Sequence, residues 1–211
     1  MLVAVAGLIG AGKSTLVGAL DGHRFYEPVE TNPYLELYYQ DMYRWCFPMQ
    51  VHLLYSRWEI IQQAYWQQKD GSLAILDRSI YEDWAFAWLG YKAGYMSKLE
   101  YDTYCRMHEH LCTYAIPFPD LILYLDAPID CLLEHIRSRD RGCEAGIMRE
   151  YLEKLQAAYN ELLPSIGSKV PLKVIDARQS KEAVVAEASA AILARKSFFE
   201  EQRPPRYRGG V

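Results

Sequence analysis

The sequence predicts an α/β fold in which a five-stranded parallel sheet lies between two layers of helices. Two observations predict this architecture: five short apolar runs alternate with longer helical stretches, and a glycine-rich loop follows the first run. In such an alternation, each helix is a right-handed crossover between parallel strands. The 211 residues are 51% hydrophobic and 24% charged, which excludes a globally disordered chain and a coiled-coil rod.

The five predicted strands are apolar runs bounded by Gly, Pro or Asp. They cover residues 2–6, 25–29, 73–76, 121–125 and 170–175. Because the carboxyl ends of parallel strands meet at one edge of a sheet, we expect ligands to bind at that edge.

The clearest predicted helix covers residues 47–68. Apolar side chains recur there at spacings of four and three, at Phe47, Val51, Leu54, Trp58, Ile61 and Tyr65. This stripe suits a protein core and a subunit interface equally well. Gln50 and Arg57 are seven positions apart, so they share a helix face beside the stripe, and taken alone they are typical of a solvated flank.

Composition and the chain ends limit the function classes. We expect one domain over residues 1–201 and a disordered tail over residues 202–211, which is rich in Pro, Gly and Arg. With 27 acids and 23 bases the net charge is −4, which does not favour a nucleic-acid binder. No apolar run is long enough for a membrane span, and the apolar start lacks the basic region of a signal peptide. Five cysteines without a C-x-x-C pair predict neither a disulfide framework nor a zinc site. We therefore expect a cytoplasmic protein, or one in the host cytoplasm if the chain is viral.

Residues 7–14 match the phosphate-binding pattern G-x-x-x-x-G-K-[ST] directly after a predicted strand and before a predicted helix. This context predicts a P-loop NTPase-like fold, in which backbone N–H groups hold phosphate oxygens. Lys13 is then expected at the β- and γ-phosphates, and Ser14 at a Mg²⁺ ion. The predicted ATP-binding loop consists of Gly7, Leu8, Ile9, Gly10, Ala11, Gly12, Lys13, Ser14 and Thr15. A loop that binds a nucleotide without transferring a phosphoryl group fits the pattern as well.

Acidic side chains follow three of the predicted strands. Glu27 lies near the end of the second strand, Asp77 with Arg78 follows the third, and Asp126 follows the fourth. A carboxylate at this edge can accept a proton from a hydroxyl, and an arginine can stabilise charge on a transferred group. Acids at strand ends are also frequent helix caps, which is the interpretation that we prefer for Asp126.

Three arginines stand at alternate positions near the end of a predicted helix, at residues 137, 139 and 141. Cations stabilise the C-terminus of a helix through its dipole. Alternate spacing does not fit one helix face, so these arginines fit equally well a lid over residues 137–145 that closes on a triphosphate.

These residues resemble the deoxynucleoside kinases, especially the bacterial deoxyadenosine, deoxyguanosine and deoxycytidine kinases. The order and spacing of the shared motifs agree over about residues 1–165. Besides the P-loop, the motifs are Glu27-Pro28-Val29-Glu30, Asn32-Pro33-Tyr34-Leu35-Glu36, Arg44-Trp45-Cys46-Phe47, Asp77-Arg78-Ser79-Ile80-Tyr81-Glu82-Asp83, Met96-Ser97-Lys98 and Arg139-x-Arg141 with Glu144. The sequence departs from the family where Asp140 replaces a lid glycine and where His135 stands in place of an arginine.

The resemblance implies that ATP, with Mg²⁺, phosphorylates the 5′-hydroxyl of a deoxynucleoside. It implies that Glu27 is the base that takes the proton from this hydroxyl, and that Arg78 binds near the hydroxyl and the incoming phosphoryl group. Asp77 matches the acid that helps to hold Mg²⁺. Tyr39 and Glu144 match the pair that binds the 3′-hydroxyl of the sugar.

The resemblance implies a further set of residues for the nucleobase of the deoxynucleoside and for ATP. Gln50, Arg57 and Asp83 match the residues that read the base of the deoxynucleoside. Arg139 and Arg141 match lid arginines that bind ATP, and Arg178 is a candidate on the adenine side. The resemblance also implies a homodimer through packed helices.

Asp83 with Arg57 goes with purine and cytosine substrates in this family, since thymine has no exocyclic amine for a carboxylate to accept from. We therefore rank deoxyadenosine first, then deoxyguanosine and deoxycytidine, with thymidine last. A nucleoside monophosphate kinase such as thymidylate kinase shares the P-loop, but it needs basic residues for the acceptor phosphate where Glu27 stands. A non-catalytic kinase-like subunit is expected to lack Lys13, Glu27 or Arg78, and this chain keeps all three.

Overall fold

The computed structural model describes residues 1–27, 31–68, 71–115, 118–138 and 147–201. Its five strands form one parallel sheet in the order β2-β3-β1-β4-β5, which confirms the predicted architecture. The strands are β1 (Leu2–Gly7), β2 (His23–Phe25), β3 (Ala74–Asp77), β4 (Leu121–Asp126) and β5 (Leu172–Asp176).

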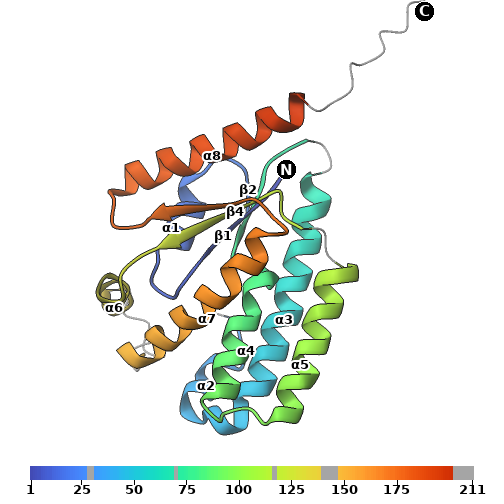
Figure 1. The fold of residues 1–211 in the computed structure, drawn as a ribbon, viewed down its shortest axis with the longest axis vertical. Helices are drawn as coiled ribbons and strands as arrows, with labels where there is room; N and C mark the ends of the chain where they lie inside the picture. The colour runs from blue at the N-terminus through green and yellow to red at the C-terminus, as the bar shows by residue number, and fades with distance from the viewer. Residues whose placement is uncertain (28–30, 69–70, 116–117, 139–146, 202–211) are drawn as a thin grey trace, which may run out of the picture.

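Helices cover both faces of the sheet (Figure 1). On one face lie α1 (Lys13–Ala19) and α8 (Lys181–Glu201), which contact each other. On the other lie α3 (Met42–Gln67), α4 (Asp83–Lys92) and α7 (Arg149–Gly167), with α5 (Lys98–His110) packed outside α3 and α4. Shorter elements complete the described chain: α2 (Leu35–Gln40), the 3₁₀ helix η2 (Ile80–Glu82), the π-helical turn η3 (Leu111–Ala115) and α6 (Ile129–Ser138).

The core lies around the three central strands. Every residue of β1 and β3 is buried, without the alternation of a one-sided sheet, because helices cover both faces. The edge strands β2 and β5 are more exposed and carry polar residues. No helix in the described part of the chain has both the length and the apolar character that a membrane span requires. The expected cytoplasmic location stays a prediction.

Two predicted strands were misplaced. The second was expected over residues 25–29, but β2 ends at Phe25, so Glu27 lies two residues beyond the strand. The fifth was expected from residue 170, but β5 begins at Leu172. Val170 still belongs to the turn that ends α7, since its N–H donates to the Ile166 carbonyl at 2.9 Å, and Pro171 has no N–H to give to a sheet.

The long helix α3 also begins earlier than predicted. The Asp41 side chain caps it by accepting the N–H of Arg44 at 3.1 Å. Within the predicted stripe, Leu54 and Ile61 are buried, whereas Phe47, Val51, Trp58 and Tyr65 are half-buried. Residues 202–211, where the sequence predicts a disordered tail, lie outside the described residues.

Candidate active site

The phosphate-binding loop connects β1 to α1 at the carboxyl edge of the sheet. All three of its glycines have positive φ, 142° at Gly7, 86° at Gly10 and 89° at Gly12. A Cβ atom at Gly7 would lie 2.8 Å from the Leu125 carbonyl oxygen, and one at Gly10 would lie 2.6 Å from that of Leu132. Both positions therefore require glycine for conformation and for space.

Lys13 is buried at the start of α1, and its Nζ donates to the Leu8 carbonyl at 2.7 Å. Burial, assisted by the nearby Arg78 cation, lowers the pKa of Lys13 to about 7. A triphosphate beside this amine would favour its charged form. The loop is therefore built to take an anion.

The next residue of the loop, Ser14, donates its hydroxyl to Asp77 at the end of β3. A hydroxyl and a carboxylate are oxygen ligands of the kind that Mg²⁺ prefers when it also binds substrate phosphates. Among the described residues no three His, Cys, Asp or Glu side chains gather as a closed metal site. A Mg²⁺ ion that keeps water and phosphate ligands does not need one, so this pair fits the expected ion.

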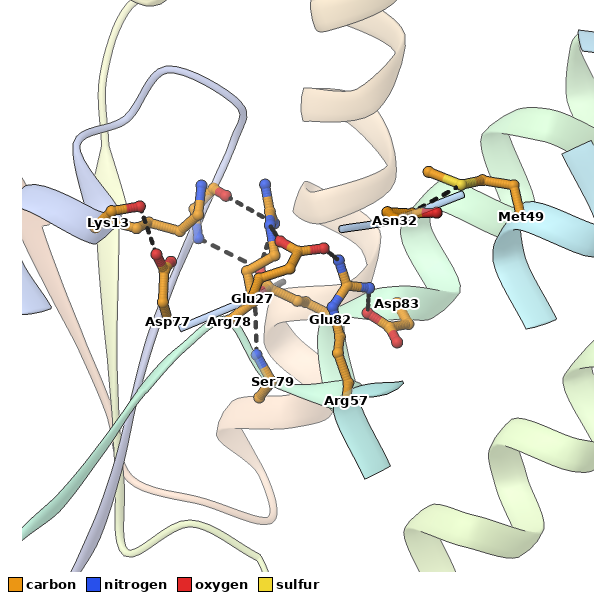
Figure 2. A network of polar contacts seen from close by, with 12 residues as sticks. Lys13, Glu27, Asn32, Met49, Arg57, Asp77, Arg78, Ser79, Glu82 and Asp83 are labelled. Atoms are coloured by element: carbon orange, nitrogen blue, oxygen red, sulfur yellow. Dashed lines mark hydrogen bonds and ion pairs between the residues drawn. The ribbon is translucent and has the colours of Figure 1, made fainter. Parts of the chain in front are cut away.

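Glu27 lies between two arginines (Figure 2). Its Oε1 atom is 2.5 Å from Nη2 of Arg57, and its Oε2 atom is 3.3 Å from Nε of Arg78. Burial alone would raise the pKa of Glu27, but Arg57, Arg78 and Lys13 together hold it below its usual value. Glu27 is therefore an ionised carboxylate at neutral pH, held among cations.

Arg57 also forms an ion pair with Asp83, on the side away from Glu27 (Figure 2). Gln50 and Arg57 are both buried, so their shared helix face lies in the interior and not in solvent. Five buried polar atoms on the packed helices α3, α4 and α5 have no hydrogen-bond partner among the described residues; they are Gln50 Oε1, Arg57 Nε, Trp58 Nε1, Asp83 Oδ2 and Tyr104 OH. Unpaired buried polar atoms are costly, so their grouping indicates a site that a polar ligand completes.

Burial raises the pKa of Asp83 to about 7, against the attraction of Arg57. The carboxyl group has no exposed surface, and only one of its oxygens has a partner among the described residues. A ligand that donates a hydrogen bond to the second oxygen would stabilise the ionised form.

Arg78 is the one residue other than glycine with positive φ in the described part of the chain, at 74°. Its N–H continues the sheet by donating to the Val5 carbonyl at 3.0 Å, and the chain then turns away from the sheet. This strained backbone directs the guanidinium to Glu27 and to the P-loop, where Nη1 donates to the Gly7 carbonyl at 3.2 Å. The ring of Phe86 covers the guanidinium, 4.9 Å away.

The remaining predicted site residues divide into two groups. Tyr39, on α2, is half-buried with its ring 5.3 Å from that of Tyr38, and Arg178 is exposed and forms an ion pair with Asp176 at 2.6 Å. The lid arginines Arg139 and Arg141 and the sugar residue Glu144 lie outside the described residues, so their roles stay predictions.

Three residues near the site were given no role from the sequence. His135, at the end of α6, makes a hydrogen bond from its Nδ1 atom to the Gly10 carbonyl at 2.8 Å. Glu82 and Tyr159 are buried beside Arg78 and form a hydrogen bond with each other at 2.5 Å. The pattern Ser-x-x-Glu over residues 79–82 is typical of a helix start, and it was the available signal for Glu82.

Comparison with known proteins identifies the family. The deoxynucleoside kinase family pattern matches residues 3–195. The chain is 34% identical to a deoxyadenosine kinase of Dictyostelium discoideum over 99% of this chain and 85% of that protein. It is 34% identical to a deoxyadenosine/deoxycytidine kinase of Bacillus subtilis over 82% of this chain and 81% of that protein.

Solved structures agree. The deoxyadenosine kinase of M. mycoides, with its products dCMP and dCDP bound, superposes with a TM-score of 0.82 at 29% identity, covering 92% of this chain and all of that one. The same enzyme with bound dATP also gives a TM-score of 0.82. A match over nearly the whole chain, together with the P-loop and the buried carboxylate beside it, shows that this chain belongs to the deoxynucleoside kinase family.

Proposed function

We propose that the chain transfers the γ-phosphoryl group of ATP to the 5′-hydroxyl of a deoxynucleoside, with deoxyadenosine as its best acceptor. The observation that supports this most directly is the ionised Glu27 carboxylate between two arginines, next to a phosphate-binding loop. A carboxylate suits a neutral hydroxyl as acceptor and repels the phosphate of a nucleoside monophosphate.

Glu27 binds the 5′-hydroxyl and takes its proton as the new O–P bond forms. Its low pKa makes it a weak base, which is sufficient because the transition state of phosphoryl transfer is loose and the hydroxyl loses its proton late. Arg78 stabilises the charge on the transferred group. Its guanidinium is held by the P-loop on one side and by Glu27 on the other. Lys13 binds the β- and γ-phosphates.

Ser14 and Asp77 would hold a Mg²⁺ ion beside the phosphates of ATP. The ion, when bound, neutralises phosphate charge. Both side chains lie at the carboxyl edge of the central strands, where β3 ends and α1 begins, so they face the same phosphates as the P-loop.

The base of the acceptor binds to the unpaired atoms of Gln50 and Asp83. An adenine amino group donates to Asp83 Oδ2, while Gln50 offers both a donor and an acceptor to the edge of the base. Thymine presents two carbonyl oxygens and a ring N–H but no amino group, so it cannot give Asp83 the amino-group hydrogen bond.

This assignment predicts the order of kcat/KM among the four deoxynucleosides, measured with ATP by coupled assay: deoxyadenosine first, deoxyguanosine and deoxycytidine next, thymidine last. A site that pairs its polar groups with a substrate rejects analogues that leave them unpaired, by up to about 10⁴-fold. Deoxynucleoside monophosphates serve as the control acceptors. Highest activity on thymidine would contradict the base assignment, and highest activity on a monophosphate would contradict the proposed reaction.

The pKa of Asp83 predicts a pH dependence for binding of deoxyadenosine alone. A donor on the base favours the ionised carboxylate, so affinity rises with pH and levels off once Asp83 is ionised in the free protein. With a pKa of about 7, the affinity should increase by about tenfold from pH 6 to pH 8. Calorimetry in buffers of different ionisation enthalpy should also detect proton release.

Asp83→Asn removes the titrating group while keeping its shape, so it should abolish both the pH dependence and the proton release. If the wild-type affinity were the same at pH 6 and pH 8, Asp83 would not accept the hydrogen bond from the base.

We also expect a homodimer through α3 and α5. A groove of about 980 Å³ lies between these helices and is lined by apolar side chains that include Val51, Leu54, Trp58 and Met107. Tyr55 and Tyr114 at its border are more than half exposed. A second copy of the chain would cover this surface.

Light scattering after gel filtration tests the dimer. Met107→Glu places a charge in the groove and should convert a mass of two chains into that of one. Leu193→Glu makes the same kind of change on exposed α8 and should leave the dimer intact. A wild-type protein with the mass of one chain would contradict this interface.

A further inference from the structure

Glu82 is the most fully bonded carboxylate beside the proposed reaction centre. It is 1% exposed. Its Oε2 atom accepts the N–H of Gly7 at 3.3 Å and the hydroxyl of Tyr159 at 2.5 Å, and it lies 3.4 Å from Nη1 of Arg78. Its Oε1 atom accepts the N–H of Ser79 at 3.2 Å. One side chain therefore joins the P-loop, α7 and the segment that follows β3.

These contacts replace a missing piece of the sheet. The pairing of β1 with β3 ends at Val5 and Asp77, and the chain turns away at Arg78. Gly7 extends beyond this point, with its N–H and C=O directed to the side that β3 has left. Glu82 accepts from that N–H, and Arg78 donates to that C=O at 3.2 Å. Two side chains thus continue the hydrogen bonding where the backbone of β3 stops.

Glu82 and Arg78 also connect the part of the site that binds ATP to the part that binds the deoxynucleoside. Gly7 begins the loop that holds the phosphates of ATP. Arg78 contacts Glu27, which binds the acceptor hydroxyl, through its Nε atom, while its Nη1 atom contacts Glu82 (Figure 2). Without Glu82, Glu27 would be the one described carboxylate in an ion pair with the guanidinium.

We propose that Glu82, supported by the Tyr159 hydroxyl, is a positioning residue for phosphoryl transfer: it holds the Arg78 guanidinium against the P-loop and away from a tight pair with Glu27. It touches neither substrate. Its effect is on the alignment of Arg78 in the transition state, so its loss should lower kcat and leave binding of both substrates nearly unchanged.

Tyr159 extends this control to α7. That helix begins at Arg149, shortly after residues 137–145, over which the sequence predicts the ATP lid. The Tyr159 hydroxyl donates to Glu82 and accepts from Nη1 of Arg78 at 3.1 Å. Tyr159→Phe removes these two bonds and little else, since the ring stays packed against Phe86 and Tyr124.

A purely structural role for Glu82 would be to cap the short helix η2. The chain contains a matched control for this role, because Glu100 forms the same capping box with Ser97 at the start of α5, on the surface and away from the site. Glu100→Gln therefore measures the cost of neutralising a capping-box glutamate without touching Arg78.

The experiment compares Glu82→Gln, Tyr159→Phe, the double variant and Glu100→Gln with the wild-type protein. The inference rests on the proposed function, so wild-type activity with ATP and deoxyadenosine is measured first. Glu82→Gln should lower kcat by about 10- to 100-fold, per nucleoside-binding site counted by calorimetry, with KM for both substrates nearly unchanged. Tyr159→Phe should lower kcat less, and the double variant should lose less than the product of the single losses.

A second readout does not depend on turnover. The guanidinium ¹⁵N signals of Arg78 report its contacts by NMR, and these signals should shift in Glu82→Gln and Tyr159→Phe but not in Glu100→Gln. If the wild type phosphorylates deoxyadenosine and Glu82→Gln keeps the kcat of Glu100→Gln, the inference is wrong. If the wild type lacks the activity, the proposed function is wrong, and unchanged Arg78 signals would then overturn the positioning role as well. Tyr159→Phe gives both readouts if Glu82→Gln does not fold.

Discussion

Glu27→Gln should lower kcat by about 10²- to 10⁴-fold while the protein still binds deoxyadenosine. The amide keeps the shape of the side chain and one oxygen for hydrogen bonding, but it cannot take the proton of the 5′-hydroxyl. The change also removes the anion that Arg57 and Arg78 share, at 2.5 and 3.3 Å, so each arginine loses an ion-pair partner. Initial rates with ATP at saturating deoxyadenosine measure the loss, and calorimetry measures binding.

The pH profile supplies a control for this result. The arginines hold the pKa of Glu27 below its usual value, so the carboxylate is ionised well below neutral pH and should contribute no acid limb to kcat from about pH 5 to pH 8. Glu36→Gln, which changes a carboxylate on the neighbouring helix α2, should leave kcat near that of the wild type. A Glu27→Gln protein with wild-type kcat would assign Glu27 a structural role only.

Arg78→Gly should lower kcat by about 10³-fold or more, the effect typical of an arginine that stabilises the transferred phosphoryl group. Two opposing effects should act on the free energy of unfolding. Glycine relieves the positive φ of 74°, but it leaves the carboxylates of Glu27 and Glu82 without their shared cation in the interior. The second term is larger, so the melting temperature should fall.

Arg78→Ala separates the strain from the charge. It loses the same guanidinium but keeps a side chain in the left-handed region, so it should be about 1 kcal/mol less stable than Arg78→Gly while being equally inactive. Chemical denaturation of the two variants measures this difference. Equal stabilities would mean that the backbone at Arg78 is not strained, and a Gly variant with near wild-type kcat would remove Arg78 from the reaction.

The parts of the site that the sequence predicted depend on local geometry. The P-loop follows from a short pattern between a strand and a helix, and the helix face that Gln50 and Arg57 share follows from helical periodicity. Strand β2 was misplaced because it is a short edge strand with exposed His23 and Arg24, so no apolar run marks it. Apolar content predicts buried strands well and edge strands poorly.

The parts that the sequence did not predict depend on distant residues. Tyr159 and Glu82 are 77 positions apart, and only the packing of α7 against α4 and η2 brings them together. The strained φ of Arg78 has no local signal either, because arginine does not favour that conformation. Both features arise where the chain leaves the sheet, and they could be found only in the folded structure.

The bridge that Arg57 makes between Glu27 and Asp83 has a consequence for fidelity. One guanidinium binds both Asp83, which we propose contacts the nucleobase, and Glu27, which we propose contacts the nucleophilic oxygen. A nucleobase that makes no hydrogen bond to Asp83 leaves Arg57 as the partner of that carboxylate, which changes the ion pair between Arg57 and Glu27. A mismatched acceptor would therefore be penalised after it has bound, in turnover as well as in affinity. In the proposed mechanism, nucleobase selection and group transfer share one cation, so redesigning either should disturb the other.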